Sequence, residues 1–313
     1  MKKVDFSNPG ISFVTGVPIT KGVGLLVLSI DELFEKKEAH SILVYKENNI
    51  ASGVLVPSNC CDVTVVRNNG NIFGYFLGED GEIWCFDGNS IESMGAINHE
   101  AHSSMNRSQT IFSNGQQYVV GGGSAIYYRD NCRDMQSEWQ QVEVDMISEI
   151  DQYKYVGFEK VIGNEKKHLY LFGWHGLAYL IRNNKIQRIV LPVNVDLYDA
   201  VYASDGSVYV CGEKGTVLKG TGLDNWEIID NEVTNDKLWG VCSYMGRIFV
   251  SSMSEIYEVL RGGGVQKVLF SENSVIPSLT YKLKSCEECL WSIGSKQLVE
   301  FDGVEWRDNL KLS

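Results

Sequence analysis

The sequence predicts an all-β protein built from a unit of four short antiparallel strands that repeats along the chain. An apolar triplet, a glycine-type turn and a second strand recur at steps of 43, 52, 39, 40 and 42 residues, starting from Tyr75, Tyr118, Tyr170, Tyr209, Phe249 and Trp291. A short strand precedes each copy and a polar strand follows it, and the NNG, EDG, SDG and FDG turns between strands suit tight hairpins. Four strands about every 40 residues is the period of a β-propeller blade. We therefore expect a single β-propeller domain over residues 1–313.

The strands of each unit can be assigned in chain order as a, b, c and d. Strand a is the short segment before the anchor, as in "DVTVVRNNG" and "LYDAVYASDG", and strands b and c are the two halves of segments such as "YVCGEKGTVLKGTG". Strand d is polar and often carries a tryptophan, as in "NWEIIDNEV" and "VEWRDNL". The clear repeats cover about residues 61–310. A degenerate copy, "LLVLSIDELFEKK" from Leu25, predicts a first blade over about residues 10–60.

Seven blades are therefore expected, and the alternative is a six-bladed ring in which residues 1–60 form a separate cap. The last blade has its own outer strand in "VEWRDNLKLS", which leaves the manner of ring closure open. The chain also resembles bacterial propeller repeats of the form "LWGV…G.IYV.G..G.V……W", matched at Leu238–Val241, Ile248–Val250 and Trp226. It lacks the Gly-His…Trp-Asp signature of WD repeats and the Asp-box of sialidase-type propellers. The resemblance implies an architecture only, because propellers host many unrelated functions.

Composition excludes several classes of function. The formal net charge of −12 argues against binding a phosphate backbone, which needs clustered Lys and Arg. No window approaches 18 uninterrupted apolar residues, so no membrane span is expected. The N-terminal "MKKVDFSNPG" has no apolar run behind its lysines, so no signal peptide can be read. We expect a cytoplasmic protein whose eight cysteines are reduced thiols.

No catalytic or metal-binding motif stands out, and no cofactor is expected. There is no G-x-S-x-G elbow, P-loop or G-x-G-x-x-G between a strand and a helix. The segment "NHEAH" places His99, Glu100 and His102 close together, but its spacing is not that of H-E-x-x-H, and we interpret it as structural or adventitious. In "SCEEC", Cys286 and Cys289 fit a hairpin with facing thiols and no second pair follows, so a structural role is favoured.

Strand alternation places the b–c turns and the d-to-a crossings on one face of the ring, and loops on a rigid scaffold usually carry function. This face should hold the longest b–c insertion, Asp31–His40, expected as a short helix. Three windows without Lys or Arg, between Arg67 and Arg107, Arg133 and Lys154, and Lys219 and Lys237, hold 17 of the 40 carboxylates. A solvated polar edge explains these windows as well as an acidic docking surface does. The residues expected to contact a partner are Glu79, Asp80, Glu100, Asp145, Glu149, Asp151, Trp174, His175, Glu232 and Asp236.

The leading hypothesis is a non-catalytic protein-binding propeller, specifically a bacterial immunity or antitoxin-like inhibitor. It would occlude the active site of a basic toxin such as a nuclease, with carboxylates in place of substrate phosphates and charge complementarity speeding capture. One alternative is a scaffold or assembly factor, like the photosynthetic assembly propellers whose repeats these resemble. Another is a hydrolase or lyase acting on a glycan or small ester at the mouth of the ring, where Trp174, His175 and nearby acids would converge.

Overall fold

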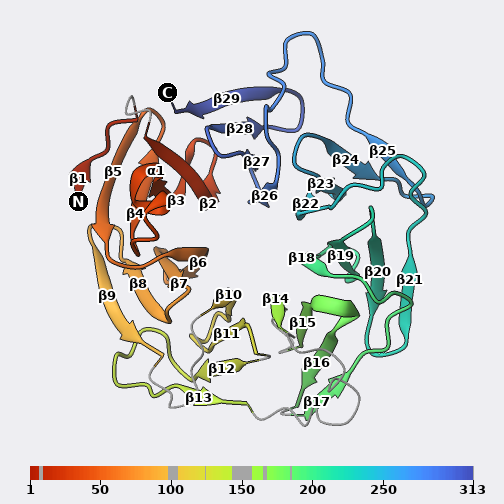
Figure 1. Ribbon diagram of the computed structural model, residues 1–313, viewed down its shortest axis with the longest axis horizontal. Helices are drawn as coiled ribbons and strands as arrows, with labels where there is room; N and C mark the ends of the chain where they lie inside the picture. The colour runs from red at the N-terminus through yellow and green to blue at the C-terminus, as the bar shows by residue number, and fades with distance from the viewer. Residues whose placement is uncertain are drawn as a thin grey trace.

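The computed structural model describes residues 1–6, 10–97, 105–123, 125–142, 157–164, 168–183 and 185–312. These residues form seven antiparallel sheets arranged as blades around a central axis, with strand a of each blade innermost (Figure 1). The prediction of seven blades is confirmed, because residues 11–56 form a blade of the ring. No helix in these ranges has the length and apolarity needed to cross a membrane.

Each blade is a meander of four strands, and blade 1 gains β1 as a fifth, outermost strand paired with β5. The strands of blades 1 to 3 are β1 (Lys2–Lys3), β2 (Ile11–Thr20), β3 (Val23–Ile30), β4 (Ser41–Glu47) and β5 (Ile50–Val56); β6 (Cys60–Asn68), β7 (Asn71–Gly78), β8 (Glu82–Phe86) and β9 (Ile91–Ala96); β10 (Asn106–Ile111), β11 (Gln117–Gly121), β12 (Ile126–Arg129) and β13 (Gln140–Gln141).

The strands of blades 4 to 7 follow the same order. They are β14 (Phe158–Gly163), β15 (Leu169–Gly173), β16 (Ala178–Arg182) and β17 (Lys185–Arg188); β18 (Leu197–Tyr202), β19 (Val208–Gly212), β20 (Val217–Thr221) and β21 (Asn225–Ile228); β22 (Gly240–Tyr244), β23 (Arg247–Ser251), β24 (Ile256–Val259) and β25 (Val265–Lys267); β26 (Lys282–Ser285), β27 (Leu290–Ile293), β28 (Gln297–Phe301) and β29 (Trp306–Lys311).

Two short helical segments lie in b–c turns. The predicted insertion in blade 1 contains helix α1 (Asp31–Glu35), and blade 4 has a 3-10 turn, η1 (Trp174–Gly176). The hairpin turns follow the expected chemistry: at the tip of β6–β7, Asn69 and Gly70 have φ angles of 49° and 81°, the left-handed pair that a type I′ turn requires.

The core is divided into apolar clusters that lie between neighbouring blades. Blades 1 and 2 bury one such cluster around Phe76, and blades 4 and 5 bury another around Phe172. Among the described residues, a cluster of this kind lies at every blade interface, including the one between blades 7 and 1. Strand b of each blade is therefore largely apolar on both faces, as in β15 and β19, as expected for sheets that are packed on both sides.

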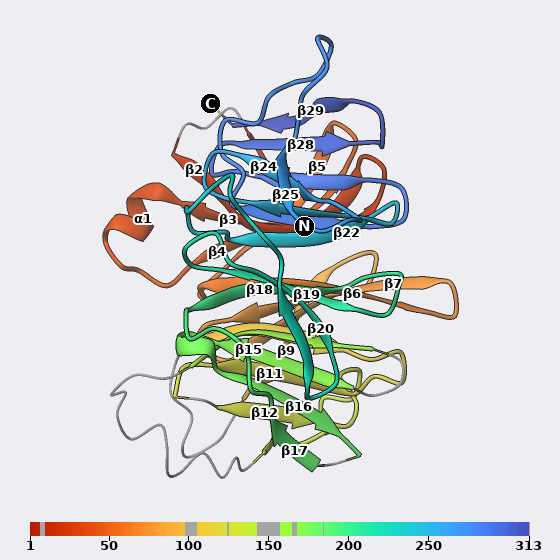
Figure 2. The same cartoon turned by 90° about the vertical axis from the view of Figure 1, so that its right-hand side faces the viewer.

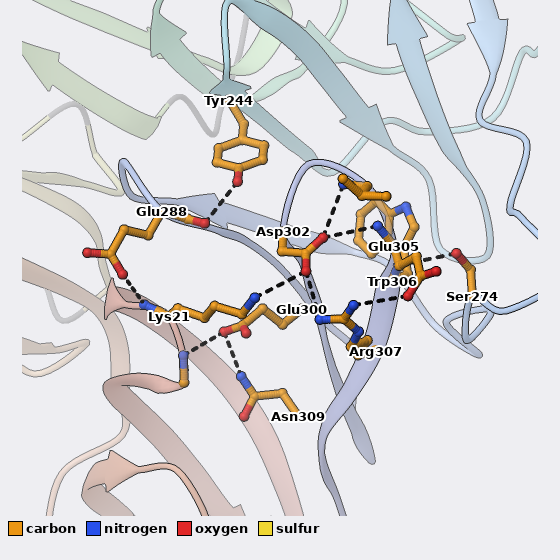
Figure 3. A network of polar contacts seen from close by, with 12 residues as sticks. Lys21, Tyr244, Ser274, Glu288, Glu300, Asp302, Glu305, Trp306, Arg307 and Asn309 are labelled. Atoms are coloured by element: carbon orange, nitrogen blue, oxygen red, sulfur yellow. Dashed lines mark hydrogen bonds and ion pairs between the residues drawn. The ribbon is translucent and has the colours of Figure 1, made fainter.

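The ring closes without exchanging strands, because β26–β29 of blade 7 and β2–β5 of blade 1 are separate sheets. Side chains close the seam instead (Figure 3). The buried carboxylate of Glu300 accepts hydrogen bonds from the Gly22 amide, the Trp291 indole and the Asn309 amide, each at 2.9 Å. Lys21 adds an ion pair to Asp302 at 3.1 Å. Chain ends far apart in the sequence are thus joined by a polar network laid over an apolar cluster.

Candidate protein-docking face

The two faces of the ring are built from different loops. Figure 2 shows α1 projecting from one side, while the β6–β7 hairpin ends on the other. The b–c turns and d-to-a crossings lie on the α1 side, as strand alternation in every blade requires. We call this side, with its loops at residues 31–40, 79–81, 174–177, 189–196, 213–216, 229–239, 252–255, 268–281 and 294–296, the crossing face.

An irregularity in the innermost strands shapes the mouth of the ring on this face. The pairing of strand a with strand b shifts by one residue near the start of β6, β10, β14 and β18, which leaves Cys61, Arg107, Glu159 and Tyr198 as extra residues. Such bulges bend the strand and redirect side chains, and they are common at barrel rims and beside functional sites. Three of these residues contact loops of the crossing face: Arg107 binds Glu79, Glu159 binds Trp174 and Tyr198 binds Glu213.

The residue after each bulge connects its blade to the next one. Asp62 accepts the Gln109 amide at 2.9 Å, and Asp199 accepts the Val241 amide at 3.2 Å. Ser108 occupies the equivalent position in blade 3 and accepts an amide of blade 4 at 3.4 Å. These contacts form a buried polar belt that joins neighbouring innermost strands, so carboxylates at these positions are structural.

In blade 4 the same position carries Lys160, whose Nζ lies 2.8 Å from Asp199 Oδ1, with the two side chains 13% and 7% exposed. Burial disfavours the charged form of Asp199, but Lys160, Lys284 and Lys282 outweigh it and lower its pKa to about 2. Burial, together with the positive charge of Lys160, lowers the pKa of Lys284 to about 8. The ionisation of Asp199 and Lys284 is therefore set by charged side chains of the innermost strands.

A cluster of aromatic and charged side chains lies where blade 5 meets blade 6 on the crossing face. The Tyr198 and Trp239 rings stack with centroids 4.3 Å apart, and Lys237 Nζ lies within 6 Å of both ring centroids. Lys237 also pairs with Glu213 at 2.7 Å, and this hydrogen bond lowers the pKa of Glu213 and raises that of Lys237. Both aromatic rings are half-exposed, so the cluster is an ordered, amphipathic surface.

The crossing at residues 229–239 is held rigidly beside this cluster. Asn231 donates to the Gly215 carbonyl at 2.7 Å and accepts the amides of Val233 and Thr234, while the Gly215 amide donates back to the Asp236 carbonyl at 2.8 Å. Gly215 has a φ of +66°, and a Cβ there would lie 2.1 Å from the Thr234 carbonyl oxygen, so only glycine fits.

This pinned loop presents its polar ends to solvent. The side chains of Glu232 and Asp236 are exposed, and no ion pair or hydrogen bond holds either carboxylate within the part of the chain that the structure describes. Val233, between them, is 48% exposed. The loop therefore offers two uncompensated charges around a small apolar contact.

The predicted residues on blades 2 and 4 are also on this face, but they have internal partners. Glu79 pairs with Arg107 at 2.8 Å, and Asp80 accepts the Ser58 hydroxyl, which fixes its turn. Trp174 donates its indole N–H to Glu159 at 2.7 Å. His175 sits in the left-handed region at φ 55° and donates its amide to Asp196 at 2.8 Å.

The six predicted residues that the structure describes therefore lie in three groups around the rim, on blade 2, blade 4 and the crossing after blade 5. Glu100, Asp145, Glu149 and Asp151 lie outside the described residues, as do His99 and His102 of "NHEAH". Sequence reasoning missed the Tyr198–Trp239 stack and Lys237. The recurring "LW" and "LY" at the start of strand a was the available signal, since it marks an aromatic residue at the mouth.

No residues in the described ranges bring together three or more His, Cys, Asp or Glu side chains in a way that could hold a metal ion. The groups that the crossing face offers to a partner are thus aromatic rings and carboxylates.

Comparison with known proteins gives one relative that matches nearly end to end. No family model matches the chain. The chain is 26% identical over 306 residues to the immune protein Tsi7 of Pseudomonas aeruginosa, covering 96% of this chain and 97% of that protein. Among solved structures, YCF48 bound to D1 peptide has a TM-score of 0.65 at 12% identity, over 96% of this chain and 93% of that one. A catalytically inactive virginiamycin B lyase from Staphylococcus aureus with quinupristin has a TM-score of 0.63 at 10% identity, over 80% and 84%. At such identities the structural likenesses show the propeller fold alone.

Proposed function

We propose that this protein is an immunity protein that binds a protein toxin and inhibits it without catalysis. The observation that carries the proposal is the similarity to the immune protein Tsi7, which runs over 96% of this chain and 97% of that protein. A match of that extent runs along the whole ring and is not confined to one blade or one repeat.

We place the docking surface on the crossing face. Its loops are tied to one another by backbone hydrogen bonds, for example from Gly176 to Val195 at 2.7 Å and from Gly215 to Asp236 at 2.8 Å. A surface ordered in this way loses little conformational entropy on binding, which favours tight inhibition. Tyr198 and Trp239 are residue types that often dominate binding energy in protein interfaces, and they lie next to the exposed loop at 229–239.

The toxin surface that fits this face is basic. The carboxylates of Glu232 and Asp236 have no internal partner in the described ranges, so a Lys or Arg of a toxin gains their full attraction on contact. Glu79, by contrast, is compensated by Arg107 and contributes less. The other predicted contacts, Glu100, Asp145, Glu149 and Asp151, belong to the same proposal on sequence grounds. Covering the toxin's active site, as in a nuclease whose substrate is polyanionic, is the inhibitory mode this charge favours.

The test begins with protection. A toxin gene encoded beside the gene for this chain is expressed in a host cell, and growth is measured with and without co-expression of the chain. Restored growth, together with a stoichiometric complex of the two purified proteins, supports the proposal. Unchanged killing by every neighbouring toxin, or turnover of chromogenic glycosides or esters by the purified chain, would overturn it in favour of an enzyme.

Charge reversal then tests the docking surface. Two unit charges 6 Å apart in water interact by about 0.7 kcal/mol, so reversing one carboxylate changes its interaction by about 1.4 kcal/mol, or roughly tenfold in affinity. The double variant Glu232→Lys/Asp236→Lys should therefore weaken toxin binding at least about tenfold at low salt. The matched control Asp224→Lys/Glu227→Lys adds the same charge to the c–d turn and outer strand of the same blade and should bind as the wild type does. Equal effects from both variants would exclude this surface.

A further inference from the structure

The a–b hairpin of blade 7 carries the two thiols of "SCEEC", and their geometry allows a reaction as well as a structural role. Cys286 and Cys289 are the first and last residues of the turn between β26 and β27, and the Cys286 amide donates to the Cys289 carbonyl at 2.9 Å. Their Sγ atoms lie 3.6 Å apart. The Cα atoms at the ends of a β-turn lie less than about 7 Å apart, and disulfides span about 4.4–6.8 Å, so a bond can form with little movement of the backbone.

The two thiols differ in access and in acidity. Cys286 is half-buried and lines a channel cavity of about 440 Å³, whereas Cys289 is fully buried. The hydrogen bond from the Cys289 thiol outweighs burial and lowers the pKa of Cys286 to about 6, while the same contact and burial raise the pKa of Cys289. Cys286 is thus positioned as the attacking thiolate and Cys289 as the resolving thiol.

The other cysteines lack this combination. Burial is the largest influence on each, and it raises the pKa of Cys60 to about 12 and that of Cys85 to about 11. The pKa values of Cys61, Cys132, Cys211 and Cys242 are also raised above their ordinary value. Cys286 is therefore the thiol from which reaction with an oxidant is expected to start.

We propose that Cys286 and Cys289 form a reversible dithiol–disulfide site, oxidised by low-molecular-weight disulfides that enter through the channel. The Cys286 thiolate attacks one sulfur of the disulfide RSSR, forms a mixed disulfide and releases RS⁻. Cys289 then loses its proton, attacks Cys286 Sγ and displaces the second RS⁻. The two cysteines lose two electrons, and RSSR is reduced to two thiols.

The site lies at the seam that closes the ring, so oxidation of the two thiols changes contacts between blade 7 and its neighbours. While the Cys286 thiol is protonated and donates to Cys289 Sγ, the Cys289 thiol donates to the Thr20 carbonyl of blade 1 at 3.8 Å. In the same turn, Glu288 accepts the Lys21 amide of blade 1 at 3.0 Å and the Tyr244 hydroxyl of blade 6 at 2.9 Å. Oxidation removes the Cys289 donor and cross-links a turn that contacts both neighbouring blades.

The experiment incubates the folded, reduced protein with glutathione disulfide and counts free thiols after denaturation. The wild type should lose two of its eight thiols and yield a peptide in which Cys286 and Cys289 are joined. Cys289→Ser should stop with one glutathione on Cys286, and Cys286→Ser should not react. Cys85→Ser, which removes another half-buried thiol, should retain the wild-type reaction.

Two results overturn the proposal: all eight thiols remaining free in the wild type, or glutathione appearing on Cys286→Ser as readily as on Cys289→Ser. A second measurement on the wild type avoids dependence on variants that fail to fold. Alkylation of the folded protein should modify Cys286 first, with a rate that rises through a pH midpoint of about 6. A midpoint near the ordinary thiol value would also contradict the assignment.

Discussion

Replacing Glu300 with alanine should weaken the ring at its closure. Glu300 is 8% exposed, and one of its carboxylate oxygens accepts three hydrogen bonds that join β28 to blade 1, to β27 and to β29. Hydrogen bonds to a charged group contribute about 1.5–3 kcal/mol each. The Trp291 indole is fully buried and would be left without an acceptor, while the Gly22 amide and the Asn309 side chain are partly exposed and can turn to water.

The expected loss of unfolding free energy is therefore about 3–4 kcal/mol, dominated by the orphaned indole N–H and the lost cross-blade bond. Glu300→Gln keeps an acceptor oxygen and should lose about 1–2 kcal/mol. Glu305→Ala, which breaks only a surface pair with Arg307, should lose less than about 1 kcal/mol. Urea unfolding followed by tryptophan fluorescence and circular dichroism measures all three. A Glu300→Ala protein within 1 kcal/mol of the wild type would refute this account of the seam.

Three further substitutions test the channel and the packing at the seam. The folded-state pKa of Asp199, about 2, lies below its ordinary 3.8, so its ion pair contributes about 2 kcal/mol above pH 4 and is lost as the pH falls from about 4 to about 2; Asp199→Asn should remove this acid-dependent part of the urea midpoint. Because the pKa of Lys284 falls from 10.5 to about 8, its ammonium costs stability at pH 7, and Lys284→Met should raise the free energy of unfolding by at least about 1 kcal/mol at pH 7 and less at pH 10.5. A Cβ on Gly24 would lie 2.3 Å from the Trp291 ring, so Gly24→Ala should cost more than about 3 kcal/mol in thermal unfolding, whereas Gly262→Ala, which meets open space, should be nearly neutral.

The architecture was predictable because each blade repeats one local pattern. Strands b and c carry the apolar residues of two interfaces, so anchors such as Tyr170 and Tyr209 recur at nearly constant spacing. The first blade was the hardest to recognise, since Asp31–His40 separates its strands b and c. Closure was unpredictable in principle: it depends on Gly22 meeting Glu300, a contact that spans 278 residues and has no counterpart in the repeat.

The candidate site was predicted at the level of loops and not of side chains. The topology of a meander fixes which turns share a face, so Glu79, Trp174 and Glu232 were placed on one side correctly. Which charges remain available is a three-dimensional fact. Arg107 compensates Glu79 because a bulge in β10 redirects it toward blade 2, and a one-residue register shift leaves no mark in the sequence.

The bulge also separates stability from recognition along a single strand. In blade 5 the bulged residue, Tyr198, faces the mouth, and the next residue, Asp199, holds the amide of Val241 in blade 6. A change at the first position alters the surface offered to a partner, and a change at the second loosens two blades. On the docking surface proposed above, specificity for a toxin can therefore shift through bulge and crossing residues while Asp62, Ser108 and Asp199 keep neighbouring blades joined. Substituting Trp239 or Tyr198 should accordingly alter toxin affinity with little change in unfolding free energy, and substituting Asp199 should do the reverse.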